Sequence, residues 1–262
     1  MIATVAARNV GDRYRSVLGY GIGLGLMIVW VMAIYPSVQG ELGAYVDAMP
    51  DAMKSMFRIE DVTSLAGFVQ AEIMSFMGPL VFIALAITSG ASTIAGEERE
   101  RILPIVLATG IGRGRLVAAK LAAVAVQLGA VGVCTLIALM IGTMAAGGGI
   151  TVARLTAGAV QLTALGLLFG ALAVAVGAAT GRKSVAAGVA TGVALGSYLI
   201  DALAGMAGWL EPLQVVSPFH WHAPNNPLVA GLSVGWLALL LATTAVLAVV
   251  AVVTFDRRDV GV

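Results

Sequence analysis

Six long stretches of weakly charged, apolar sequence constrain the fold of this 262-residue chain more than any other feature. They cover residues 17–36, 67–95, 116–145, 152–179, 185–208 and 232–255. Each has about the 20 residues that an α-helix needs to cross a bilayer. Hydrophobic residues make up 60% of the chain, more than a soluble core of this size buries. The stretches lack the period-two alternation of membrane β-strands. We therefore expect an all-α polytopic membrane protein, with six transmembrane helices in a single transmembrane domain.

Basic residues indicate the orientation of these helices. If both termini are cytoplasmic, twelve of the fifteen Lys and Arg residues lie inside, and only Lys54, Arg58 and Arg154 lie outside. Cytoplasmic loops carry an excess of Lys and Arg, so cytoplasmic N- and C-termini are preferred. High Ala, Gly and Val content, with Arg favoured over Lys, is typical of a GC-rich bacterial genome. The expected location is the bacterial plasma (inner) membrane, as a multi-pass protein. A net charge of +1 without a basic patch gives no indication of nucleic-acid binding.

Two segments on the predicted outer side have their own character. Residues 37–66 are acidic overall and carry apolar residues at helical spacing, which predicts an outer amphipathic helix after span one, restarted at Pro50. It either packs on the other spans or gates a substrate path. Residues 209–231 combine prolines with aromatic residues and predict a tight cap. His220 and His222 supply at most part of a metal-ligand set, so we expect no metal site.

A dense charge cluster stands between the second and third apolar stretches. Residues 96–101 read Gly-Glu-Glu-Arg-Glu-Arg, and an apolar run with one proline follows. Acidic residues favour the first turn of a helix and oppose its last, so Gly96 is expected to end span two. Glu97 and Glu98 then open a short cytoplasmic helix. An i,i+4 ion pair stabilises a helix by only about 0.3–0.5 kcal/mol, so a partner surface explains five clustered charges better. The alternative is a solvated interfacial helix without a partner.

The segment Glu-Glu-Arg-Glu-Arg-Ile-Leu-Pro-Ile-Val-Leu-Ala-Thr-Gly, with Ile-Gly-Arg-Gly-Arg and Lys120 behind it, resembles the coupling segment of type-2 ATP-binding-cassette (ABC) transporter permeases. There a Glu-Glu pair is usually followed by Gly-Thr-Leu, an apolar run ending in Ala-Thr-Pro, a basic turn and a Lys that begins span three. The six-span layout and the element Ser-Pro-Phe at 217–219 are also similar. The chain departs from the family at Arg101, Ile102, Pro104 and Gly110, so the docking groove on its partner would be particular to this permease.

The resemblance implies the permease subunit of an ABC exporter that moves a hydrophobic or amphipathic substrate, such as a drug, lipid or peptide-like molecule, outward. It implies two copies of an ATP-binding cassette subunit docked on the coupling segment 96–115, and a second copy of this permease or a homologous one, surrounded by membrane lipid. The implied ATPase-coupling residues are Glu97, Glu98, Arg99, Arg101, Leu103 and Leu107, the charged ones through charge complementarity.

The sequence contains no nucleotide-binding signature. No Gly-x-x-x-x-Gly-Lys-Ser/Thr run, the loop that cradles ATP phosphates, occurs in the chain. We therefore expect no catalytic residue and no cofactor on this chain, with ATP and Mg bound by the partner subunit.

Two acidic residues are embedded among apolar neighbours: Glu72 near the outer start of span two, and Asp201 near the outer end of span five. A charge at the bilayer midplane costs at least about 2.5 kcal/mol and is a functional hypothesis by default. With Tyr198, one helical turn before Asp201, they are candidates for a substrate path or gate. The alternative is a solvated helix end or a local hydrogen bond, because the cost falls near the interface.

Two other functions are compatible with six spans. An ATP-independent secondary transporter is disfavoured, because the sequence has neither paired charges at the midplane nor a convincing inverted repeat. A non-transporting membrane anchor for a soluble partner explains the coupling segment, but not the two embedded acids or the elaborated outer segments.

Overall fold

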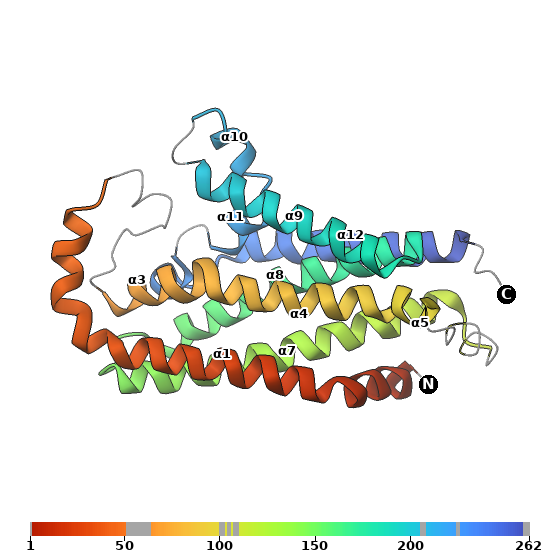
Figure 1. The fold of residues 1–262 in the computed structure, drawn as a ribbon, viewed down its shortest axis with the longest axis horizontal. Helices are drawn as coiled ribbons and strands as arrows, with labels where there is room; N and C mark the ends of the chain where they lie inside the picture. Colours follow the sequence, from red (N-terminus) through yellow and green to blue (C-terminus); the bar gives the residue numbers. More distant parts are fainter. Residues whose placement is uncertain are drawn as a thin grey trace.

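The computed structural model describes residues 2–50, 64–99, 103, 106, 110–204, 208–223 and 226–258. Within them the protein is helical and has no strand (Figure 1). Six helices are long and apolar enough to cross a membrane, which confirms the six-helix prediction. These candidate spans are Ser16–Glu41, Leu65–Thr93, Arg113–Ala145, Val152–Thr180, Lys183–Leu203 and Val234–Arg257.

The first helix is longer than the sequence predicts. α1 (Ile2–Asp47) continues through Pro36, where the first predicted span ends. Pro36 lacks the N–H that would bind the carbonyl of Met32, and such a gap lets a helix bend. The last part of α1 turns away from the long axis of the bundle (Figure 1). The predicted restart at Pro50 leads into residues 51–63, which lie outside the described part of the chain.

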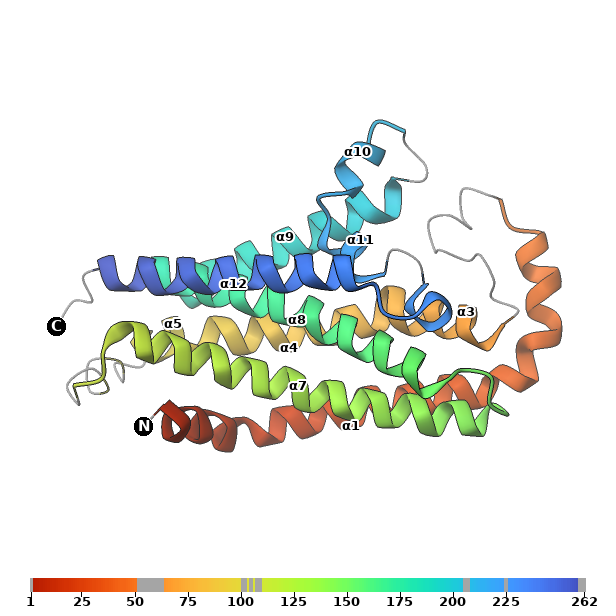
Figure 2. The ribbon, with the colours of Figure 1, turned by 180° about the vertical axis from the view of Figure 1, so that it is seen from behind.

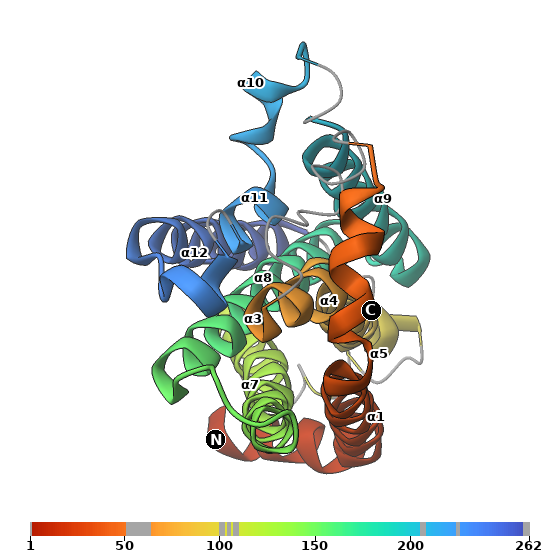
Figure 3. The ribbon, with the colours of Figure 1, turned by 90° about the vertical axis from the view of Figure 1, so that its left-hand side faces the viewer.

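α8 (Val152–Thr180) is the central helix, and most of its length is buried. Four other long helices pack against it: α4 (Gly78–Thr93), α7 (Arg113–Ala145), α9 (Lys183–Leu203) and α12 (Val234–Arg257). α1 packs mainly along α7, at the edge of the bundle (Figure 2). The end-on view in Figure 3 shows the same arrangement, with α8 between α12 and α4. Packing around one central helix lets the peripheral helices present their apolar faces outward.

α1 begins and α12 ends at the same end of the bundle, where the short helix α5 (Ala95–Arg99) also lies (Figure 1). We call this the termini end. The other end, the cap end, holds α11 (Pro218–His222), which covers part of the bundle, and α10 (Glu211–Gln214), which projects from the bundle next to α9 (Figures 1 and 3). The predicted tight cap over residues 209–231 is thus built from short helical turns, including the π-helical segment η2 (Asn226–Ala230).

Span two is built from three consecutive helical segments. They are α3 (Leu65–Val69), the π-helical segment η1 (Gln70–Met77) and α4. The N–H of Gly78 donates to the carbonyl of Ile73, five residues earlier, as in a π-helix. In this pattern the Met74 carbonyl would accept from residue 79, but Pro79 has no N–H. His222 Nε2 lies 3.1 Å from the Met74 carbonyl and takes the place of the missing donor. The π-helical segment is therefore stabilised by a contact from the cap.

Glycine allows a close approach between α4 and α8 at Gly90. A Cβ atom on Gly90 would lie 2.7 Å from the carbonyl oxygen of Gly170 and 2.9 Å from the Cβ of Ala173. Small residues allow such close backbone approach in membranes, where lipid gives no hydrophobic drive for helix association. Any side chain at position 90 must therefore push these two helices apart.

Candidate coupling site and substrate path

α5 is the separate short helix that the sequence predicts after span two. The sequence places the boundary at Gly96, but α4 ends at Thr93 and the chain bends at Ile94. The hydroxyl of Thr93 donates to the carbonyl of Gly90 at 2.6 Å. A side-chain hydroxyl that donates to a backbone carbonyl competes with the backbone N–H group that would otherwise bind this carbonyl in the helix. Gly96 consequently lies inside α5, where it is buried.

The carboxylates of Glu97 and Glu98 bind cations of the same chain. Lys120 Nζ, on α7, donates to Glu97 Oε1, and the exposed fractions of these side chains are 4% for Lys120 and 18% for Glu97. Arg258 Nη2, after α12, donates to Glu98 Oε2, with exposed fractions of 18% and 29%. Contact of the two glutamates with an ATP-binding subunit stays a prediction. The two ion pairs also hold α5 against spans three and six.

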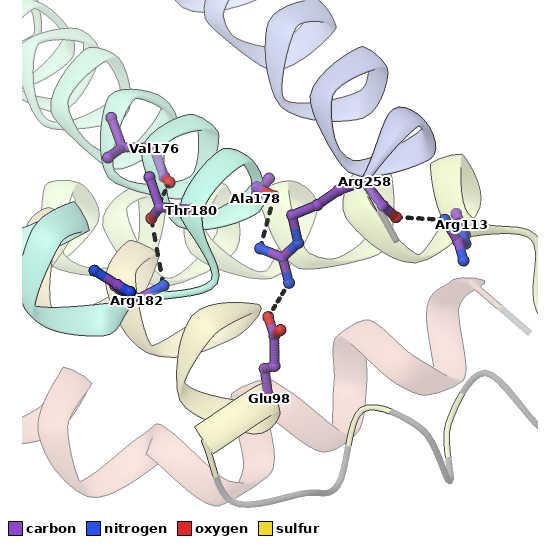
Figure 4. A network of polar contacts seen from close by, with 7 residues as sticks. All are labelled: Glu98, Arg113, Val176, Ala178, Thr180, Arg182 and Arg258. Atoms are coloured by element: carbon purple, nitrogen blue, oxygen red, sulfur yellow. Dashed lines mark hydrogen bonds and ion pairs between the residues drawn. The ribbon is translucent and has the colours of Figure 1, made fainter. Parts of the chain in front are cut away.

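Arg258 has more than one partner at the termini end (Figure 4). Its Nη1 donates to the carbonyl of Ala178, in the last turn of α8, at 3.0 Å. Its own carbonyl accepts from Arg113 Nη1, at the start of α7, at 2.8 Å, and the same nitrogen lies 3.3 Å from the carbonyl of Asp256. Together with the bond to Glu98, these contacts join α5, α7, α8 and α12 at one place.

The other predicted coupling residues have different environments. Arg99, the last residue of α5, has an exposed side chain. Leu103 is fully buried in the hydrophobic core, and Val106 packs against that core while half-buried. Arg101 and Leu107 lie outside the described residues. Leu103 therefore packs into the bundle, and Arg99 is the charged residue of α5 whose side chain is exposed.

The departure from the family pattern at position 110 has a conformational reason. Gly110 has φ of +79°, in the region that favours glycine. Proline, with φ fixed near −65°, cannot adopt this conformation. The chain then enters α7 through Gly112, the residue before its first turn. A turn with a left-handed residue replaces the proline turn that the family usually has.

An apolar cavity of about 470 Å³ lies between α4 and α9. Hydroxyl groups of Thr88, Thr191 and Tyr198 are the polar side-chain groups in its wall. The remainder of the wall is apolar: Phe76, Pro79, Leu80, Ile83, Ala84, Ile87, Ala187, Ala194, Leu195 and Phe219. Mostly apolar walls with a few polar groups are typical of sites for small organic ligands. This cavity is the candidate substrate path.

Three aromatic rings separate this cavity from a smaller one towards the cap end. Phe76, Tyr198 and Phe219 line both the large cavity and a second cavity of about 40 Å³. The Tyr198 ring lies 6.1 Å from that of Phe76 and 5.4 Å from that of Phe219, measured between centroids. The small cavity is more polar, with Ser75, Asp201 and His222 in its wall. The three aromatic rings thus form a shared wall between the large apolar cavity and the smaller cavity that contains Asp201.

Of the three candidate path residues, Tyr198 and Asp201 come together and Glu72 stands apart. Gln214 Nε2 donates to Asp201 Oδ1 at 3.2 Å, and His220 Nδ1 lies 3.8 Å from the same oxygen. The side chain of Glu72 is exposed on η1 and, within the described part of the chain, lines neither of these two cavities. A path role for Glu72 stays a prediction without a geometric link to the other two residues.

The Ser-Pro-Phe element ties the cap to spans four and five. Ser217 Oγ accepts from the N–H of Phe219 at 3.2 Å, and it donates to the carbonyl of Ser197, on α9, at 2.8 Å. Pro218 begins α11, where its fixed φ suits the first helical position. The Phe219 ring reaches the Phe169 ring of α8, 6.3 Å away between centroids. The element therefore positions Phe219 in the aromatic wall.

A comparison with known protein families finds a match over nearly the whole chain. Residues 3–260 match the sequence profile of the family described as ABC-2 family transporter protein. The chain belongs to this family. An ABC-2 family permease is a multi-pass transport subunit that is not itself catalytic, and it normally works with an ATP-binding subunit. No curated protein sequence matches the chain significantly.

Sequence reasoning missed two residues of this ABC-2 permease as partners of the coupling segment. In the sequence, Lys120 stands at the end of the segment that resembles a coupling segment, and Arg258 is one of the twelve basic residues that indicate orientation; neither position predicts an ion pair with Glu97 or Glu98. A signal for Lys120 exists, because it lies seven residues inside α7, where a buried ammonium needs an acidic partner. No comparable local signal marks Arg258, which is 160 residues away from Glu98.

Proposed function

We propose that this chain is the membrane-spanning permease subunit of an ATP-driven exporter in the bacterial inner membrane. Two copies of an ATP-binding subunit dock on the cytoplasmic coupling segments of two permeases, which are two copies of this chain or one copy and a homologue. ATP and Mg bind to the ATP-binding subunits. The observation that carries the proposal is α5, a short helix fixed to spans three and six by two ion pairs and carrying the exposed Arg99.

The fixed position of α5 makes it suitable to receive force. A docking element that moves freely dissipates a displacement, whereas one held by partly buried ion pairs and by Leu103 in the core passes it to the spans. Closure of the ATP-binding subunits would then rock the permeases between inward- and outward-open states. The cavity between α4 and α9 is the place where a hydrophobic or amphipathic substrate would bind on its way outward.

The direct test of docking uses Arg99. In Arg99→Glu we expect binding of the ATP-binding subunit to weaken about tenfold, corresponding to ~1.4 kcal/mol, because the variant reverses an exposed charge at the contact. The permease is coexpressed with a candidate ATP-binding subunit from the same organism, and both copurification and ATP turnover in reconstituted membranes are measured. Arg257→Glu is the matched control, since Arg257 is also exposed at the termini end but lies on α12. Equal binding by both variants would contradict docking on α5.

The candidate path has its own test. In Thr191→Trp we expect loss of the stimulation of ATP turnover by hydrophobic compounds, because an indole at this position fills the cavity between α4 and α9. Turnover is measured with a panel of hydrophobic compounds and with hydrophilic compounds of similar size. Val189→Trp is the control, since Val189 is exposed on the same helix and does not line the cavity. Stimulation that survives in Thr191→Trp places the substrate elsewhere.

A further inference from the structure

We propose that Arg258, at the end of span six, is the positioning residue that carries a displacement of α5 to α8 and α12. The inference deepens the proposed function and rests on it, because it assumes that an ATP-binding subunit moves α5. It names the route of the movement inside the permease: from the coupling helix through one side chain to the central helix and to the last span.

The guanidinium group of Arg258 binds two segments at once. Nη2 donates to the carboxylate of Glu98 on α5, and Nη1 donates to the carbonyl of Ala178 on α8 (Figure 4). The N–H donors of an arginine are fixed in one plane. If the Glu98 carboxylate moves and the guanidinium group follows it, the donor that binds the Ala178 carbonyl must move as well. A lysine ammonium on a flexible stem would not connect the two acceptors in this way. The side-chain chemistry therefore suits transmission between the two helices.

The backbone acceptors at this place are groups that need partners. The last carbonyls of a helix have no intrahelical donor, and a cation near them interacts favourably with the helix dipole. Ala178 lies in the last turn of α8 and is capped by Arg258. Asp256 and Arg258, at the end of α12, present their carbonyls to Arg113, the first residue of α7. The ends of α8 and α12 and the start of α7 are thus held by one continuous network.

The turn between spans four and five is shaped to accommodate the ion pair. Gly181 has φ of +66°, and a Cβ atom there would lie 2.7 Å from Arg258 Nη1 and 2.8 Å from Glu98 Oε2. The backbone conformation favours glycine, and a Cβ atom would push the ends of the Arg258 and Glu98 side chains aside. This gives an independent means of perturbation, because Gly181→Ala displaces the ion pair without removing a charge.

The experiment measures movement in the complete complex. The permease, with Cys134→Ala and spin labels on cysteines placed at Ser16 and Val253, is reconstituted with its ATP-binding subunit. Both label positions are exposed, on α1 and on α12. In the wild-type background the distance between labels shifts on addition of ATP and vanadate. In Arg258→Gln we expect this shift to be lost, while the ATP-binding subunit copurifies at the wild-type ratio.

Three further variants separate transmission from a general structural effect. Arg257→Gln, at the exposed neighbouring position, retains the full shift. Gly181→Ala loses the shift although every charge is present, and it replaces Arg258→Gln as the decisive variant if that protein does not elute as a folded species. The double variant Glu98→Arg with Arg258→Glu restores the ion pair but not the cap on Ala178, and it recovers part of the shift.

The outcomes distinguish this inference from the function on which it rests. A full shift in Arg258→Gln or in the folded Gly181→Ala variant overturns the role of Arg258. Loss of the ATP-binding subunit from Arg258→Gln also overturns it, because the residue then serves assembly. If the wild-type complex forms and shows no shift, this inference alone fails. If no complex forms with the wild-type permease, the proposed function fails, and the transmission role fails with it.

Discussion

Replacing Lys120 by methionine is expected to lower the free energy of unfolding by about 3 to 5 kcal/mol, the usual effect of removing one partner of a buried ion pair. The side chain of Lys120 is 4% exposed and that of Glu97 is 18% exposed, so little water is available to replace the lost ammonium. Methionine preserves most of the length and the apolar stem of lysine. The measurement is unfolding of the detergent-solubilised permease by titration with a denaturing detergent.

The double variant Lys120→Met with Glu97→Gln is the matched control. It removes both charges, so it leaves no uncompensated buried charge, which is the main reason that removing one partner is destabilising. We expect it to recover most of the stability lost in Lys120→Met. If the double variant is as unstable as the single one, the loss comes from packing around Lys120 and the ion pair contributes little.

Gly90→Ala is expected to destabilise the permease by about 1 to 3 kcal/mol, the usual effect of overpacking a well-packed core. The new methyl group would lie 2.7 Å from the backbone carbonyl of Gly170, which cannot move aside by a change of rotamer. α4 and α8 must therefore separate. Since α4 also lines the candidate substrate path, the stimulation of ATP turnover by hydrophobic compounds should fall in the same variant.

Gly129→Ala on α7 is the control for this prediction. Among the described residues, no atom outside its own helical surroundings lies within 4 Å of the Cβ position of Gly129. Alanine is a better helix former than glycine by about 1 kcal/mol, so this variant should be as stable as the wild type or slightly more stable. Unfolding midpoints in the same detergent titration compare the two variants. If Gly129→Ala lowers the stability as much as Gly90→Ala does, the explanation by packing between α4 and α8 is wrong.

Features that depend on short stretches of sequence were predictable. The number of spans follows from the length of apolar sequence that a bilayer requires, and the short helix α5 follows from two acids that favour a first helical turn. The prolines around residues 212–227 predict a broken cap, and the cap consists of short helical turns. In each case the physical cause acts within a few residues.

Helix boundaries were less predictable, because they depend on groups that compete for the same carbonyl. The chain bends at Ile94, before Gly96, next to the hydrogen bond from the Thr93 hydroxyl to the carbonyl of Gly90. The π-helical segment of span two depends on Pro79 together with His222, which is 148 residues from the carbonyl that it reaches. Pro79 alone predicts an irregularity in the helix of span two. It does not predict that His222 donates to the carbonyl left without an N–H partner.

The sequence by itself determined that this chain has six helices able to span a membrane and a short charged helix between spans two and three, since hydrophobic length and local charge act along the chain. Only the tertiary structure decided what that helix is attached to. Glu97 binds Lys120, 23 residues away, and Glu98 binds Arg258, 160 residues away. Such partners are chosen by the packing of spans around α8, which brings together distant groups that must be neutralised once water is excluded. The aromatic wall at Tyr198 arises in the same way, from spans two and five and the cap.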